Sequence, residues 1–178
     1  MTPQERFIEQ AIPHETGHIL VGRVVGIPIY GLDHIVIRGP NKEVVAGNFA
    51  TKTVSPRPDA IPLTPATVLE AYVSMIGGGL AGNIITKIAA DEHGLEKDRA
   101  DLRVVSPKTL EQAAEQAMQI IEDNMNAFDL LREAIMSSYT SLMKDPGPEA
   151  GRYTLLTSRA LEQICPQNKT LFPGIAYR

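Results

Sequence analysis

The chain has 178 residues, of which 43% are hydrophobic and 21% are charged, with 17 Lys and Arg against 21 Asp and Glu. This composition excludes a wholly disordered chain, and the formal net charge of −4 argues against a surface that binds nucleic acid phosphates. Met1 to Gln10 lacks the basic and apolar regions of a signal peptide. The single cysteine, Cys165, fits a reducing compartment such as the cytoplasm.

The first predicted element is a helix from Glu5 to Val25, because apolar residues recur there at helical spacing. Pro13 lies inside this segment and is expected either to kink the helix or to begin a new one. Two β-strands are predicted next, at residues 34–38 and 44–52, with Gly47 as the position of a bulge.

The rest of the chain is predicted to be mostly helical. The run from Ala71 to Thr86 has no charged residue, but at 16 residues it is short for a membrane span, so we expect a buried helix and no membrane anchor. The acidic segment from Asp91 to Asp98 is expected to be mostly a solvated loop, with Asp98 as the one exception. The buried helix is predicted to span 65–90, and further helices are predicted at 106–124, 127–143 and 157–164. These elements predict one domain of the α+β class, with a core at about 5–144 and a C-terminal tail at 145–178.

The residues His14-Glu15-Thr16-Gly17-His18 match the pattern H-E-x-x-H, and they include half of the chain's four histidines. Positions i and i+4 of a helix lie on one face, so the two imidazoles can bind a single metal ion. Glu15 then faces the water on that metal and can act as its general base. The motif therefore predicts a hydrolytic zinc site, although such ligands also accept other divalent metals.

A catalytic zinc site usually has three protein ligands and one open position, so the motif needs a third ligand. The local sequence does not supply it, because the longer pattern H-E-x-x-H-x-x-G-x-x-H would require Gly at Val21 and His at Val24. Spacing alone does not choose among the other candidates. By their chemistry these candidates are Glu70, His93, Asp98 and Asp101.

From His14 onward the sequence resembles the peptidase domain of the FtsH-type AAA+ zinc metalloproteases, whose motif reads H-E-A-G-H. The segment Ile76-Gly77-Gly78-Gly79-Leu80-Ala81 is similar to the family's Y-G-G-R-x-A, and the resemblance covers about residues 7–139. Continuing the alignment without a gap places Asp98 on the aspartate that is the family's third zinc ligand, with Asp101 as the rival. The resemblance implies a mostly helical, zincin-like peptidase domain in which His14, His18 and Asp98 bind zinc and Glu15 is catalytic.

The family joins this peptidase to an ATPase module and a membrane anchor. No G-x-x-x-x-G-K-[ST] motif occurs in this chain, so ATP binding is not expected here and a separate ATPase is the expected source of any ATP dependence. The three glycines at 77–79 are instead expected to allow close helix packing.

The predicted function is that of a zinc-dependent metalloendopeptidase that hydrolyses unfolded or flexible polypeptides. We expect the substrate to lie along the strand at Gly47, Asn48 and Phe49, because an added strand satisfies a peptide backbone without reading its sequence closely. The alternative is a catalytically inactive relative that acts as a protein-binding adaptor. The sequence leaves open whether the chain forms a homo-oligomer.

Overall fold

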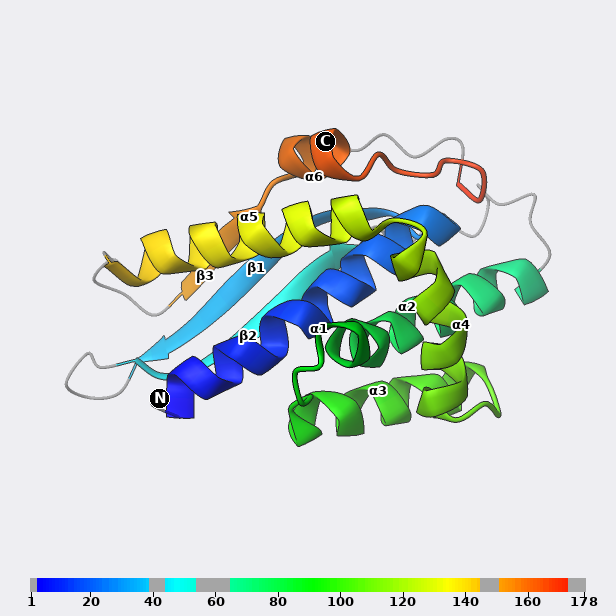
Figure 1. Ribbon diagram of the computed structural model, residues 1–178, viewed down its shortest axis with the longest axis horizontal. Coiled ribbons are helices and arrows are strands. Elements are labelled where there is room, and N and C mark those ends of the chain that lie inside the picture. The colour runs from blue at the N-terminus through cyan, green and yellow to red at the C-terminus, as the bar shows by residue number, and fades with distance from the viewer. Residues whose placement is uncertain (1–2, 39–43, 54–64, 145–150, 173–178) are drawn as a thin grey trace.

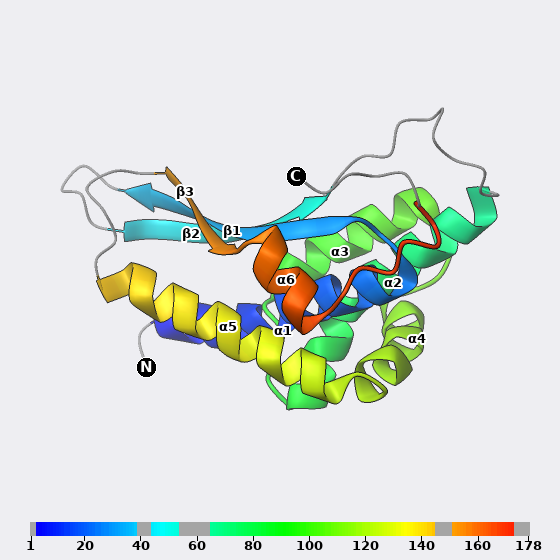
Figure 2. The same ribbon diagram turned by 90° about the horizontal axis from the view of Figure 1, so that it is seen from above.

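The computed structural model describes residues 3–38, 44–53, 65–144 and 151–172. In chain order its elements are α1 (Pro3–Val25), β1 (Ile29–Arg38), β2 (Val44–Thr53), α2 (Pro65–Thr86), α3 (Glu92–Val105), α4 (Leu110–Glu122), α5 (Met125–Lys144), β3 (Gly151–Leu156) and α6 (Ser158–Ile164). The strands form one small antiparallel sheet, and α1 and α5 lie along one of its faces (Figure 1) (Figure 2). The expected α+β class, mostly helical with a small sheet, is confirmed.

The central strand of the sheet is β1, which pairs with β2 on one side and with β3 on the other. Its residues Leu32, His34 and Val36 alternate along the strand and are buried on one face. Gly47 pairs with Val36 in continuous register, and the register shifts lie near the two ends of β1. The bulge predicted at Gly47 is therefore wrong.

Helix α1 continues through Pro13, so this residue does not begin a new helix. The proline has no amide to donate to the preceding turn, and the helix depends on tertiary packing at this point. Ile12, Ile19 and Leu20 are buried in the main core on both sides of the motif. The core therefore holds the two histidines on a continuous helix.

Two glycines let α2 approach its neighbours at backbone distance. A Cβ placed on Gly78 would lie 2.5 Å from the carbonyl oxygen of Gly17 in α1. A Cβ on Gly77 would lie 2.3 Å from the backbone of Ala113 in α4. No side chain fits at either position, so these glycines fix α2 between α1 and α4, in agreement with the close packing expected for them.

By length and composition alone, the part of α2 from Val68 to Thr86 could cross a membrane. Half of this stretch is buried within the protein, and the core helices of soluble proteins pass the same test. Its apolar character is therefore weak evidence for a membrane span.

Two helices differ from the sequence prediction. The segment that begins at Asp91 is helix α3 and not a solvated loop, because the Asp91 side chain caps the helix by accepting a hydrogen bond from the Gly94 amide. Helix α4 begins after Thr109 and not at Ser106, since Thr109 and Gln112 form a reciprocal capping box. Both predictions relied on local composition and did not weigh the side-chain caps at Asp91 and Thr109.

The C-terminal segment forms part of the main core. Strand β3 was not predicted, and it pairs with β1 from more than a hundred residues away. Phe172 is buried in the same cluster as the apolar face of α1. Arg23, itself 1% exposed, donates hydrogen bonds to the carbonyl oxygens of Ile29 and Cys165, which ties this segment to the end of α1.

The substitution Gly78→Ala should lower the free energy of unfolding by about 2 kcal/mol, because the new methyl group overlaps the Gly17 carbonyl. At an exposed helical position the same change would stabilise by about 1 kcal/mol. Urea unfolding measures the difference, and Ser74→Ala on the same helix is the control, with an expected change below about 1 kcal/mol. A gain in stability for Gly78→Ala would contradict the packing described here.

Candidate metal centre

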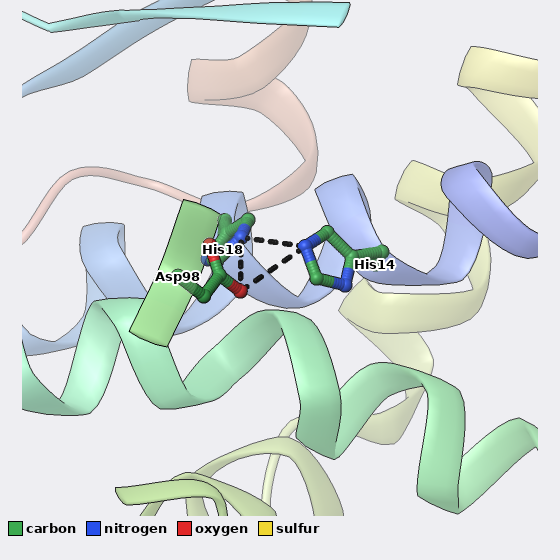
Figure 3. A group of neighbouring side chains, drawn as sticks. All are labelled: His14, His18 and Asp98. Atoms are coloured by element: carbon green, nitrogen blue, oxygen red, sulfur yellow. Dashed lines mark hydrogen bonds and ion pairs between the residues drawn. The ribbon is translucent and has the colours of Figure 1, made fainter. Parts of the chain in front are cut away.

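The two histidines of the motif lie one turn apart on α1, and their Nε2 atoms are 3.1 Å apart. Asp98 of α3 lies against both, with its Oδ2 atom 3.2 Å from His14 Nε2 and 3.4 Å from His18 Nε2. Figure 3 shows the three side chains pointing toward one another. Among the described residues, these three form the group whose ligand atoms could hold a metal ion.

The distances between the three atoms fit a small divalent cation. Zinc binds nitrogen and oxygen at about 2.0–2.1 Å in a tetrahedron, which places its ligand atoms about 3.3–3.4 Å from one another. The observed separations are 3.1, 3.2 and 3.4 Å. Two imidazoles and a carboxylate are a zinc donor set that leaves a fourth position open, although other divalent metals accept the same ligands.

Hydrogen bonds to oxygen atoms of α2 set the orientation of both imidazoles. The Asn83 amide nitrogen donates to the Gln10 carbonyl at 2.9 Å, so Asn83 Oδ1 faces His14 Nδ1 at 3.1 Å. His18 Nδ1 lies 2.8 Å from the Met75 carbonyl oxygen. Because these oxygens only accept hydrogen bonds, each Nδ1 carries a proton and a neutral imidazole presents the lone pair of Nε2 to the centre.

When both imidazoles are neutral, as metal binding requires, three acceptor atoms converge at one point. Within the described part of the chain, the buried Asp98 Oδ2 has no well-formed hydrogen bond. Burial opposes a charge on His18, but the Asp98 carboxylate outweighs it and raises the pKa of His18 to about 9. Burial also opposes the charge on Asp98, yet attraction to His18 and contact with both imidazoles hold the pKa of Asp98 well below its usual range. In the metal-free chain, His18 is therefore protonated at neutral pH, and its positive charge balances the negative charge of the buried Asp98 carboxylate.

The alternative third ligands lie apart from this cluster. Asp101 and His93 are exposed and line the cavity beside it, but neither belongs to the group of converging ligand atoms. Glu70 is exposed on α2 and is not among the residues that line the cavity. The structure places Asp98, and none of these three, beside both imidazoles.

A glycine of α2 leaves room for the imidazole rings. A Cβ on Gly79 would lie 2.6 Å from His18 Nε2 and 2.7 Å from His14 Cε1. Gly79 therefore leaves room for side chains of α1, whereas Gly77 and Gly78 lie against the backbones of α4 and α1. Nothing in the run of three glycines distinguishes this one by sequence.

The three side chains open into a cavity with a volume of about 410 Å³. Phe49, which was expected to contact substrate, is one of its lining residues. The side chains of Gly47 and Asn48, the other two expected contacts, lie outside the described residues. The described residues of β2 that line the cavity are Phe49, Ala50, Thr51 and Thr53.

Glu15 is half-buried and lines the same cavity as His14 and His18. Its Oε2 atom accepts a hydrogen bond of 3.2 Å from the Thr51 hydroxyl on β2. Sequence reasoning missed both Thr51 and Asn83. Their contacts join residues 36 and 69 positions apart, and no local pattern marks such pairs.

No family model matches the chain, and a search of curated proteins also finds no match. The interpretation of the site therefore rests on the motif and on the geometry of its residues.

Replacing Asn83 should weaken metal binding. Asn83→Leu keeps the branched shape of the side chain but removes the acceptor that orients His14, so we expect zinc affinity to fall about 10- to 100-fold. Competition with a chromophoric chelator measures this change. Asn126→Leu, at an exposed position on α5, is the control, and equal affinities for the two variants would contradict the role of Asn83.

Zinc binding should also depend on pH. Because the pKa of His18 in the metal-free chain is raised to about 9, the ion must displace a proton at neutral pH. Apparent affinity should therefore rise about tenfold per pH unit from pH 7 toward pH 9 and level off above it. Calorimetry in buffers of different ionisation enthalpy counts the released protons, and the expected number at pH 7 is about one per ion. Affinity that is flat over this range would contradict the protonated state of His18.

Proposed function

We propose that this chain is a zinc-dependent metalloendopeptidase of zincin-like fold, similar to the FtsH-type peptidases, that hydrolyses unfolded or flexible polypeptides. The observation that carries the proposal is the convergence of His14, His18 and Asp98 in a cavity that Glu15 also lines. The arrangement combines a three-ligand zinc site with a general base at an accessible surface.

When bound, a zinc ion lowers the pKa of water and polarises the carbonyl group that is attacked. Glu15 takes a proton from the attacking water and delivers it to the leaving amine. A structural metal site needs neither a general base nor an open cavity. The presence of both supports hydrolysis over the alternative of a protein-binding adaptor.

Strand β2 supports the choice of substrate. It is an edge strand of the sheet formed by the described residues, and part of it borders the cavity. An edge strand pairs only with extended backbone, so unfolded or flexible segments fit this site. Folded proteins would first have to be unfolded, for which a separate ATPase is a suitable partner.

The substitution Glu15→Gln tests the mechanism. It should leave zinc binding near one ion per chain and lower the hydrolysis of an unfolded, fluorogenic protein at least about 100-fold, because the general base is lost. Glu9→Gln, at an exposed position of the same helix, is the matched control and should keep full activity. A chelator should abolish hydrolysis by the wild-type chain.

A fully active Glu15→Gln variant would refute this mechanism. A wild-type chain that holds one zinc ion and cleaves no unfolded protein would instead favour the adaptor, and partner proteins would then be sought.

A further inference from the structure

Thr51 connects the edge strand of the sheet to the carboxylate that we propose as the general base. Its hydroxyl donates a hydrogen bond to Glu15 Oε2 at 3.2 Å. Thr51 pairs with Leu32 of β1, whose side chain is fully buried, so the Thr51 side chain points to the helical side of the sheet. Both partners of this bond are half-buried and line the cavity.

A glutamate side chain on a helix has three rotatable bonds, and ordering it costs conformational entropy. Among the described residues, Thr51 is the partner to which Glu15 is hydrogen-bonded. The hydroxyl uses one of the acceptor sites of the carboxylate, and the remaining sites can still accept a proton. Since Thr51 belongs to a paired strand, the sheet fixes the position from which the hydroxyl acts.

We propose that Thr51 is a positioning residue that holds the Glu15 carboxylate in one orientation toward the metal centre. Its effect on catalysis rests on the proposed peptidase function. Because the outer edge of the same strand would bind the substrate backbone, peptide docking and alignment of the base involve one structural element.

The first test compares Thr51→Val with Thr51→Ser in the zinc-loaded chain. Valine has nearly the shape of threonine but no hydroxyl, so kcat should fall about 10-fold while KM stays within about 2-fold of the wild type. Serine restores the hydroxyl and should recover kcat to within about 3-fold of the wild type. A loss confined to KM, or equal kcat losses for both variants, would overturn the inference.

The second test needs no hydrolysis and no metal. In the presence of a chelator, Thr51→Val should lower the folding equilibrium constant about 5-fold in the wild-type chain, because one hydrogen bond is lost. In the Glu15→Ala background the same substitution should change this constant less than about 2-fold. Equal losses in the two backgrounds would show that the two side chains are not coupled and would overturn the inference.

The two tests separate this inference from the proposed function. If the zinc-loaded wild type cleaves nothing, the peptidase is refuted. The comparison of folding constants in the wild-type and Glu15→Ala backgrounds then decides alone whether Thr51 holds Glu15. If the wild type cleaves and the folding constants show no coupling between Thr51 and Glu15, the peptidase proposal stands and the role of Thr51 is refuted.

Discussion

The backbone contact between α1 and α2 is the constraint on which the candidate centre depends. A Cβ on Gly17 would lie 1.9 Å from the carbonyl oxygen of Gly78, so only glycine is tolerated inside the motif at this position. Gly17 directly precedes His18, and the helices therefore meet at the level of the imidazoles. Because α2 lies so close, its Asn83 side chain and its Met75 carbonyl reach the Nδ1 atoms of the two histidines.

The partners that orient the imidazoles also affect the charge of the centre. Both are neutral oxygen atoms, one from the amide of Asn83 and one from the Met75 carbonyl. A carboxylate in either position would make the histidine more basic and add negative charge near the metal. With Asp98 as the single anionic ligand of the cluster, a divalent ion would keep excess positive charge, which favours polarisation of a carbonyl group.

Sequence reasoning succeeded where the signal was local and failed where it depended on distant contacts. The pair His14 and His18 follows from helical periodicity alone. Spacing did not select Asp98, and the resemblance of the surrounding segment to a known family was needed. Helix α3, which carries Asp98, was interpreted as a loop because its residues are mostly charged, and its cap at Asp91 was not weighed. The Thr51 contact requires the pairing of β2, which no motif encodes.

The described sheet has two outer strands, β2 and β3, and the second of these comes from the C-terminal part of the chain. Strand β3 pairs with β1 on the side opposite β2, and the following segment is held by Gln167, whose side chain bonds the backbone of Ile27 and Ile29. Strand β3 contributes no residue to the cavity, whereas β2 contributes several. An extended peptide added to β2 would therefore lie across the cavity and close to Glu15, but one added to β3 would lie on the far side of the sheet. Of the two outer strands, β2 is therefore the one beside the candidate centre, and the described residues of the C-terminal segment do not line the cavity.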